Sequence, residues 1–198
     1  DRYLHADLHG APSCSLRNNQ GFVVDEYPPA HISADIPAFR LVDKVEAELD
    51  DATTETAATL ALAWSRAWNS GGAHGTVFWV KPGQVSKSAV TGEYVGKGAF
   101  VIRGKRTWYK DIDLRLGVGL IAINGIPLLM ASTPEHIASI CNRYIVILPG
   151  REKKETLANR IYKSTGLSVD DILPILPGNC EVITDMSLIK FKKVDEDE

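Results

Sequence analysis

Residues 50–81 read DDATTETAATLALAWSRAWNSGGAHGTVFWVK and contain two elements that determine the predicted architecture. Acids and threonines open the segment, apolar side chains recur on one stripe, and Gly71-Gly72 follow, which is typical of a helix over 50–69. Residues 76–81 are rich in β-branched and aromatic residues and end at Pro82-Gly83, which indicates a strand. Because the helix carries many alanines, it is expected to lie close against a sheet, with Trp64 and Trp68 in its core.

The fold class expected from this pattern is α+β, with a mixed or antiparallel sheet packed against a long helix, plus a small α/β C-terminal extension. The chain has 198 residues, of which 44% are hydrophobic, enough for one large domain or two small ones. No run approaches the ~18 apolar residues of a membrane span, and the start lacks the features of a signal peptide. A cytoplasmic location without membrane attachment is therefore expected.

Three cysteines, Cys14, Cys141 and Cys180, occur without CxxC spacing. An odd number at these positions argues against both a disulfide framework and a cysteine-rich zinc site. They are expected to be small buried or half-buried thiols.

On the N-terminal side, residues 1–8 alternate between an apolar set that includes Leu4 and a polar set that includes His5, which indicates a strand with one polar face. Polar residues and prolines over 17–37 indicate a loop, and residues 39–49 are expected to form a short acidic helix.

On the C-terminal side, apolar runs flank Asn124-Gly125, the dipeptide most typical of a tight hairpin turn. Beyond it the sequence predicts helices over 134–142 and 151–164, a strand over 144–148 and a further helical turn over 169–175. The predicted organisation is a domain over 1–125 and a small extension over 126–198 that ends in an acidic tail.

Between these parts lies a basic segment over 79–110, which contains seven Lys/Arg residues and one acid, Glu93. Seven bases against one acid give this segment +6 in a chain of net charge −3, so the rest carries −9. Such charge separation creates an anion-binding face, and nucleic acid is the commonest large polyanion with a matching phosphate array. Aromatic residues in the segment could stack on unpaired bases, or they could belong to the core of a solvated basic strand pair.

Several motifs in this order resemble the RNA-binding domain of the NFACT family, in its archaeal type, whose members are ribosome quality control proteins also known through fibronectin-binding homologues. The motifs are HADLHGA at 5–11, SRAW at 65–68, WV at 79–80, QVSK at 84–87, GEY at 92–94, GAFVIRGK at 98–105 and Trp108. Three departures are that the chain starts at Asp1 without Met, that residues 34–50 read as an insertion, and that no family motif follows Asn124. The N-terminal part of the domain is therefore expected to be missing.

The resemblance implies binding of tRNA or large-subunit ribosomal RNA, contact with the ribosome, and a role in rescue of stalled translation. It implies no enzyme activity by itself and no cofactor. Phosphates are expected to be neutralised by Lys and Arg, while an amide, a hydroxyl and an exposed ring contact base edges, the ribose 2′-hydroxyl or base faces. The candidate residues are Lys81, Gln84, Ser86, Lys87, Tyr94, Arg103, Lys105 and Arg106. Trp79 is expected in the core.

His5, Asp7 and His9 admit three interpretations. On a strand they would share one face at steps of about 6.6 Å, as in a metal-dependent phosphodiesterase or RNA-modifying enzyme. They could instead be structural, with Asp7 orienting a histidine. Contact with a phosphate or ribose beside the basic segment fits the family resemblance best. A further alternative for the whole chain is a protein-interaction module whose basic face binds an acidic partner.

Overall fold

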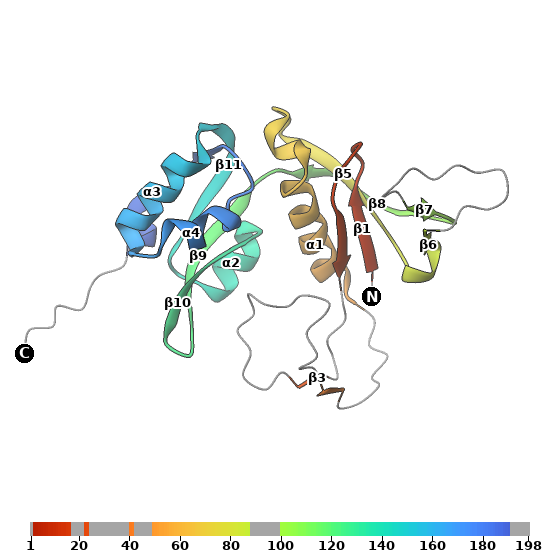
Figure 1. Ribbon diagram of the computed structural model, residues 1–198, viewed down its shortest axis with the longest axis horizontal. Coiled ribbons are helices and arrows are strands. Elements are labelled where there is room, and N and C mark those ends of the chain that lie inside the picture. Colours follow the sequence, from red (N-terminus) through yellow and green to blue (C-terminus); the bar gives the residue numbers. More distant parts are fainter. Residues whose placement is uncertain (1, 17–21, 24–39, 42–48, 88–99, 191–198) are drawn as a thin grey trace, which may run out of the picture.

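The computed structural model describes residues 2–16, 22–23, 40–41, 49–87 and 100–190. Figure 1 shows two lobes side by side, one built by the N-terminal half of the chain and the other by the C-terminal half. Each lobe contains a four-stranded antiparallel sheet and at least one helix, so the predicted α+β class is confirmed. All described strand pairs are antiparallel, which settles the expected choice between a mixed and an antiparallel sheet.

The sheet of the N-terminal lobe has the strand order β2-β1-β5-β8. Its strands are β1 (Arg2–Ala6), β2 (Ser13–Leu16), β5 (His74–Val80) and β8 (Thr107–Asp113). The strand predicted over 1–8 corresponds to β1, and the strand predicted over 76–81 corresponds to β5. Leu4, Ala6 and Val77 are fully buried on one face of the sheet, where helix α1 covers it.

Helix α1 (Asp51–Ala63) begins at Asp50, whose carboxylate accepts a hydrogen bond from the Thr53 amide at 2.6 Å. The helix packs closely on the sheet because Gly75 has no Cβ. A Cβ at this position would lie 2.6 Å from a Leu62 methyl group. The predicted helix over 50–69 is too long: Ser65 caps a separate 3₁₀ turn, η2 (Arg66–Asn69). The break turns Trp64 outward to 37% exposure, so its predicted place in the core is wrong.

Two short strand pairs extend from this lobe. Strand β3 (Phe22–Val23) pairs with β4 (Arg40–Leu41), so a strand lies within the predicted loop over 17–37, and the predicted helix over 39–49 is wrong at 40–41. The rest of that helix, apart from Leu49, lies outside the described residues. In the basic segment, η3 (Pro82–Gln84) leads into β6 (Val85–Ser86), which pairs with β7 (Val101–Ile102).

The sheet of the C-terminal lobe has the order β10-β9-β11-β12. Its strands are β9 (Leu116–Ile123), β10 (Ile126–Ser132), β11 (Tyr144–Glu152) and β12 (Cys180–Val182). The predicted hairpin is confirmed, since Ile126 pairs with Ile123 across a turn in which Asn124 and Gly125 have φ of 51° and 78°. The sequence-based boundary after residue 125 falls within this hairpin, whereas the chain passes from one sheet to the other at residues 114–115.

Helices cover the C-terminal sheet. The predicted helix over 134–142 corresponds to α2 (Pro134–Ile140), and the one over 151–164 to α3 (Lys154–Thr165). The predicted helical turn over 169–175 corresponds to α4 (Val169–Ile172) followed by η4 (Leu173–Ile175), whereas η5 (Met186–Ile189) was not predicted. Helix α3 starts three residues later than predicted because β11 continues to Glu152. It ends at Gly166, whose φ of 76° suits a residue without Cβ. Among the described helices, none is long and apolar enough to cross a membrane.

The lobes meet around Trp68, which is 1% exposed. Its indole Nε1 donates a hydrogen bond to the Asn179 carbonyl at 2.8 Å, and a Cβ at Gly178 would approach the ring within 2.8 Å. The amide of Leu114 donates to the Ala73 carbonyl at 2.8 Å close by.

The three cysteines are buried or half-buried thiols, as predicted. Cys14 is half-buried, whereas Cys141 and Cys180 are buried. Burial raises the pKa of the Cys180 thiol to about 12.

Candidate nucleic-acid interface

The face of the N-terminal sheet opposite α1 carries one row of side chains that crosses all four strands. Ser13 pairs with His5, His5 with Phe78, and Phe78 with Trp108. Since paired residues in neighbouring strands point to the same face, these four side chains stand next to one another. Alternation along the strands places Leu4, Ala6 and Val77 on the opposite, α1-covered face.

The rings in and beside this row contact one another. The centroids of His5 and Phe78 are 5.8 Å apart, and those of Phe78 and Trp108 are 5.2 Å apart with the rings edge to face. Tyr3, two residues before His5, lies 6.1 Å from Phe100. Trp108 is 41% exposed and Phe100 38% exposed, whereas Phe78 is only 4% exposed. The row therefore has a buried centre and solvent-accessible rings on two sides.

Cationic groups lie directly on these rings. The Arg106 guanidinium carbon is 4.6 Å from the Phe78 ring centroid and 5.9 Å from that of Trp108. The Lys87 ammonium is 5.7 Å from the centroid of Phe100. Within the described part of the chain, neither cation forms an ion pair with a carboxylate. An anionic ligand placed over the rings would meet both cations.

A groove with a volume of about 600 Å³ opens beside the row. Side chains of the sheet, of β7 and its flanking residues, and of the turn after β1 line this groove. Its lining includes Tyr3, His5, Asp7, His9, Phe100 and Arg106. The size is that of a typical small-ligand site, and the lining combines flat rings, one guanidinium and polar groups that donate or accept hydrogen bonds.

The turn that holds Asp7 and His9 departs from the predicted strand. Strand β1 ends at Ala6, and Gly10 takes a positive φ of 73°. Arg66 from η2 donates to the His9 carbonyl and fixes the turn. The expected 6.6 Å steps of His5, Asp7 and His9 along one strand face are therefore wrong. Within the described residues, no group of three His, Cys, Asp or Glu side chains is arranged to hold a metal ion.

Gln84 occupies the base of the loop that carries the cations. Its amide nitrogen donates to the carbonyls of Arg103 and Lys105, at 2.7 and 3.0 Å, and its amide oxygen accepts from the Lys81 amide at 3.0 Å. Both amide N–H groups are thus used within the protein. The side chain that was expected to contact a base instead shapes the loop over 103–106.

The remaining candidates fall into three groups. Lys81, just before η3, and Lys105, between β7 and β8, are exposed. Ser86 and Arg103 are half-buried, and each has a partner within the protein. Tyr94 lies outside the described residues. Trp108 is one of the aromatic residues of the basic segment that were expected either to stack on bases or to lie in the core. Tyr3, Phe78 and Phe100 were not among the candidates, although Tyr3 and His5, like Phe78 and Val80, are two positions apart on a strand, a spacing that could have revealed Tyr3 and Phe78.

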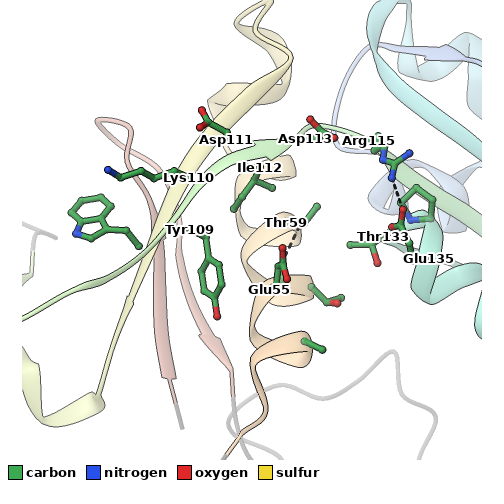
Figure 2. A pocket seen from close by; sticks show the side chains of 14 residues that line it. Glu55, Thr59, Tyr109, Lys110, Asp111, Ile112, Asp113, Arg115, Thr133 and Glu135 are labelled. Atoms are coloured by element: carbon green, nitrogen blue, oxygen red, sulfur yellow. Dashed lines mark hydrogen bonds and ion pairs between the residues drawn. The ribbon is translucent and has the colours of Figure 1, made fainter.

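A second hollow lies between α1, β8 and the start of α2 (Figure 2). Tyr109 and Ile112 point from β8 toward α1, while Lys110 extends away from the helix (Figure 2). Arg115 forms an ion pair with Glu135 on the side of the hollow next to α2 (Figure 2). Its other charged lining is mainly acidic and includes Glu55, Asp111 and Asp113. This mixture of charges does not match a polyanion, in contrast with the face around Arg106.

Comparisons with known proteins identify relatives of this chain. The chain is 32% identical over 187 residues to the archaeal Rqc2 homolog aRqcH of Methanocaldococcus jannaschii, which covers 92% of this chain and 24% of that protein. It is 35% identical over 121 residues to the ribosome quality control complex subunit NEMF of Homo sapiens and of Mus musculus, which covers 61% of this chain and 9% of each relative. No solved structure gives a significant match.

The chain thus spans about a quarter of the archaeal relative and less than a tenth of the animal ones. Residues 1–104, just over half of the chain, match the model of the NFACT protein RNA binding domain. This match includes strands β1 and β5, helix α1 and the loop over 81–87 that leads to the cationic face. The chain belongs to the family of NFACT protein RNA-binding domains.

Proposed function

We propose that this chain is the RNA-binding part of a ribosome quality control protein that acts in rescue of stalled translation. Its ligand in this proposal is tRNA or large-subunit ribosomal RNA, bound on the sheet face opposite α1. The family match and the ribosome quality control relatives support the general role. The observation that carries the site is the position of Arg106 over the rings of Phe78 and Trp108 and of Lys87 over the exposed ring of Phe100. Among the described residues, neither cation has a carboxylate partner.

Phosphate contacts provide most of the affinity in this proposal. Lys87 and Arg106 lie over rings of the face, and in this proposal Arg103 and Lys105, from the same loop as Arg106, add two further charges. About four contacts to a single strand predict that log affinity falls against log salt with a slope of about −3. Because phosphates carry no sequence information, these contacts hold every RNA alike.

The test is fluorescence anisotropy of a labelled single-stranded RNA at several salt concentrations. Lys87→Ala or Arg106→Ala is expected to weaken binding to all sequences and to flatten the slope by about 0.7. The control is Lys163→Ala, because Lys163 is an exposed lysine in the last turn of α3 in the other lobe. A quadruple reversal of Lys87, Arg103, Lys105 and Arg106 to Glu that leaves affinity unchanged would defeat the proposal.

Crosslinking in cells addresses the choice of ligand. Crosslinks of the full-length protein to tRNA or to large-subunit ribosomal RNA are the expected result, with loss in the quadruple variant. Crosslinks confined to messenger RNA would contradict the translational role while leaving RNA binding intact.

A further inference from the structure

The exposed rings on the cationic face are arranged for a ligand with flat, accessible faces of its own. Trp108, at one end of the row, and Phe100, beside it, keep 41% and 38% of their surface exposed. Arg106 lies over Phe78 and within 5.9 Å of Trp108. A guanidinium that lies flat on a ring can contact a phosphate with its N–H groups while its own face remains available for stacking.

From this arrangement we infer that the face selects unpaired RNA nucleotides over duplex RNA. The inference rests on the proposed function and specifies its ligand class. One base stacks on Trp108, a neighbouring base lies in the groove against Phe100, and Arg106 holds the phosphate between them. The buried ring of Phe78 supports both positions from beneath and does not itself touch a base.

Duplex RNA cannot satisfy these contacts. In an A-form helix each base is covered by its neighbours on both faces, so the rings would meet only the sugar-phosphate backbone. An unpaired loop, bulge or strand end presents free base faces, and stacking on an aromatic side chain is tolerant of sequence. His5 and Asp7 also line the groove, and their polar groups can hydrogen-bond a ribose hydroxyl or a base edge.

The experiment compares three RNAs of equal length on the 198-residue chain: a single strand, the same strand in a duplex, and a strand whose bases are replaced by abasic sites. Stacking is worth roughly 1–3 kcal/mol per base, which corresponds to about 5- to 150-fold in affinity. The single strand is therefore expected to bind at least about 5-fold more tightly than the abasic strand. Because the abasic strand keeps its phosphates, its salt slope should be the same.

Variants separate stacking from charge. Trp108→Ala is expected to weaken binding to the single strand by about 5-fold or more and to leave the abasic strand unaffected. Trp108→Phe should restore much of the affinity because a ring is kept. The matched control is Trp64→Ala, since Trp64 is 37% exposed at the end of α1 on the other side of the sheet.

Each outcome has a distinct meaning. Equal binding of duplex and single strand, together with no effect of Trp108→Ala, would overturn the inference while the phosphate-based function stands. Absence of salt-dependent binding to all three RNAs would instead remove the proposed function. A loss in Trp64→Ala as large as that in Trp108→Ala would also overturn the inference, because the effect would then be independent of the face.

Discussion

Removal of the Trp68 side chain should destabilise the protein more than any exposed tryptophan does, because this residue fills the junction between the lobes. Trp68 is 1% exposed, its Nε1 donates to the Asn179 carbonyl at 2.8 Å, and its ring lies against Gly178. Truncation of a buried tryptophan to alanine costs about 3–5 kcal/mol. The lost hydrogen bond is worth roughly 1 kcal/mol and falls within that range. Trp68→Ala is therefore expected to lower the free energy of unfolding by at least about 3 kcal/mol.

The assay is urea denaturation followed by far-UV circular dichroism, which avoids dependence on tryptophan emission. Trp64→Ala serves as the matched control, since Trp64 lies four positions earlier and is 37% exposed; it should change the free energy of unfolding by less than about 1 kcal/mol. A smaller m value for Trp68→Ala would indicate that the lobes no longer unfold together. A loss below about 1 kcal/mol in Trp68→Ala would refute the reasoning that this side chain holds the junction.

Two further predictions concern the loop of the cationic face and the hairpin. Gln84→Ala should weaken binding to all RNAs alike, because the Gln84 amide holds the carbonyls of Arg103 and Lys105 and so shapes the loop. Anisotropy assays with several RNA sequences should show no change of sequence preference. A changed preference would indicate that Gln84 contacts a base after all. Gly125→Ala should lower the free energy of unfolding by roughly 1 kcal/mol, because Gly125 has a φ of 78° that a residue with a Cβ rarely adopts. The control is Gly83→Ala, where a Cβ would also meet open space and the loss measured by thermal unfolding should be smaller. Equal losses in the two variants would contradict the explanation from backbone conformation.

Local patterns in the sequence were sufficient for elements whose cause is local. The Asn124-Gly125 turn needs only positive φ at two adjacent residues, and the hairpin was predicted from this dipeptide and the apolar runs on either side of it. The alternation of Leu4 and His5 likewise predicted which faces of β1 are apolar and polar. The end of α1 was missed because the apolar stripe continues through Trp64, and the cap formed by Ser65 turns the chain there.

The binding face was harder to predict because its neighbours are distant in sequence. His5 meets Phe78 only through the pairing of β1 with β5, and Trp108 joins them through β8. The turn at His9 depends on Arg66, 57 residues later. Gln84 looked free for RNA because carbonyls 19 and 21 residues away cannot be assigned to it without the register of the loops.

The placement of α1 also makes the charges on the two sides of the N-terminal sheet unequal. Asp50 and Glu55 lie on or beside the helix, where Arg2 pairs with Asp51, whereas Arg106 and Lys110 belong to the opposite side. A polyanion that approaches from the helix side is repelled, and one that approaches from the other side is attracted, so the lobe experiences a torque before contact. At physiological ionic strength this torque acts within about 8 Å of the surface. The helix that supports the sheet thereby also contributes to the orientation in which the encounter begins.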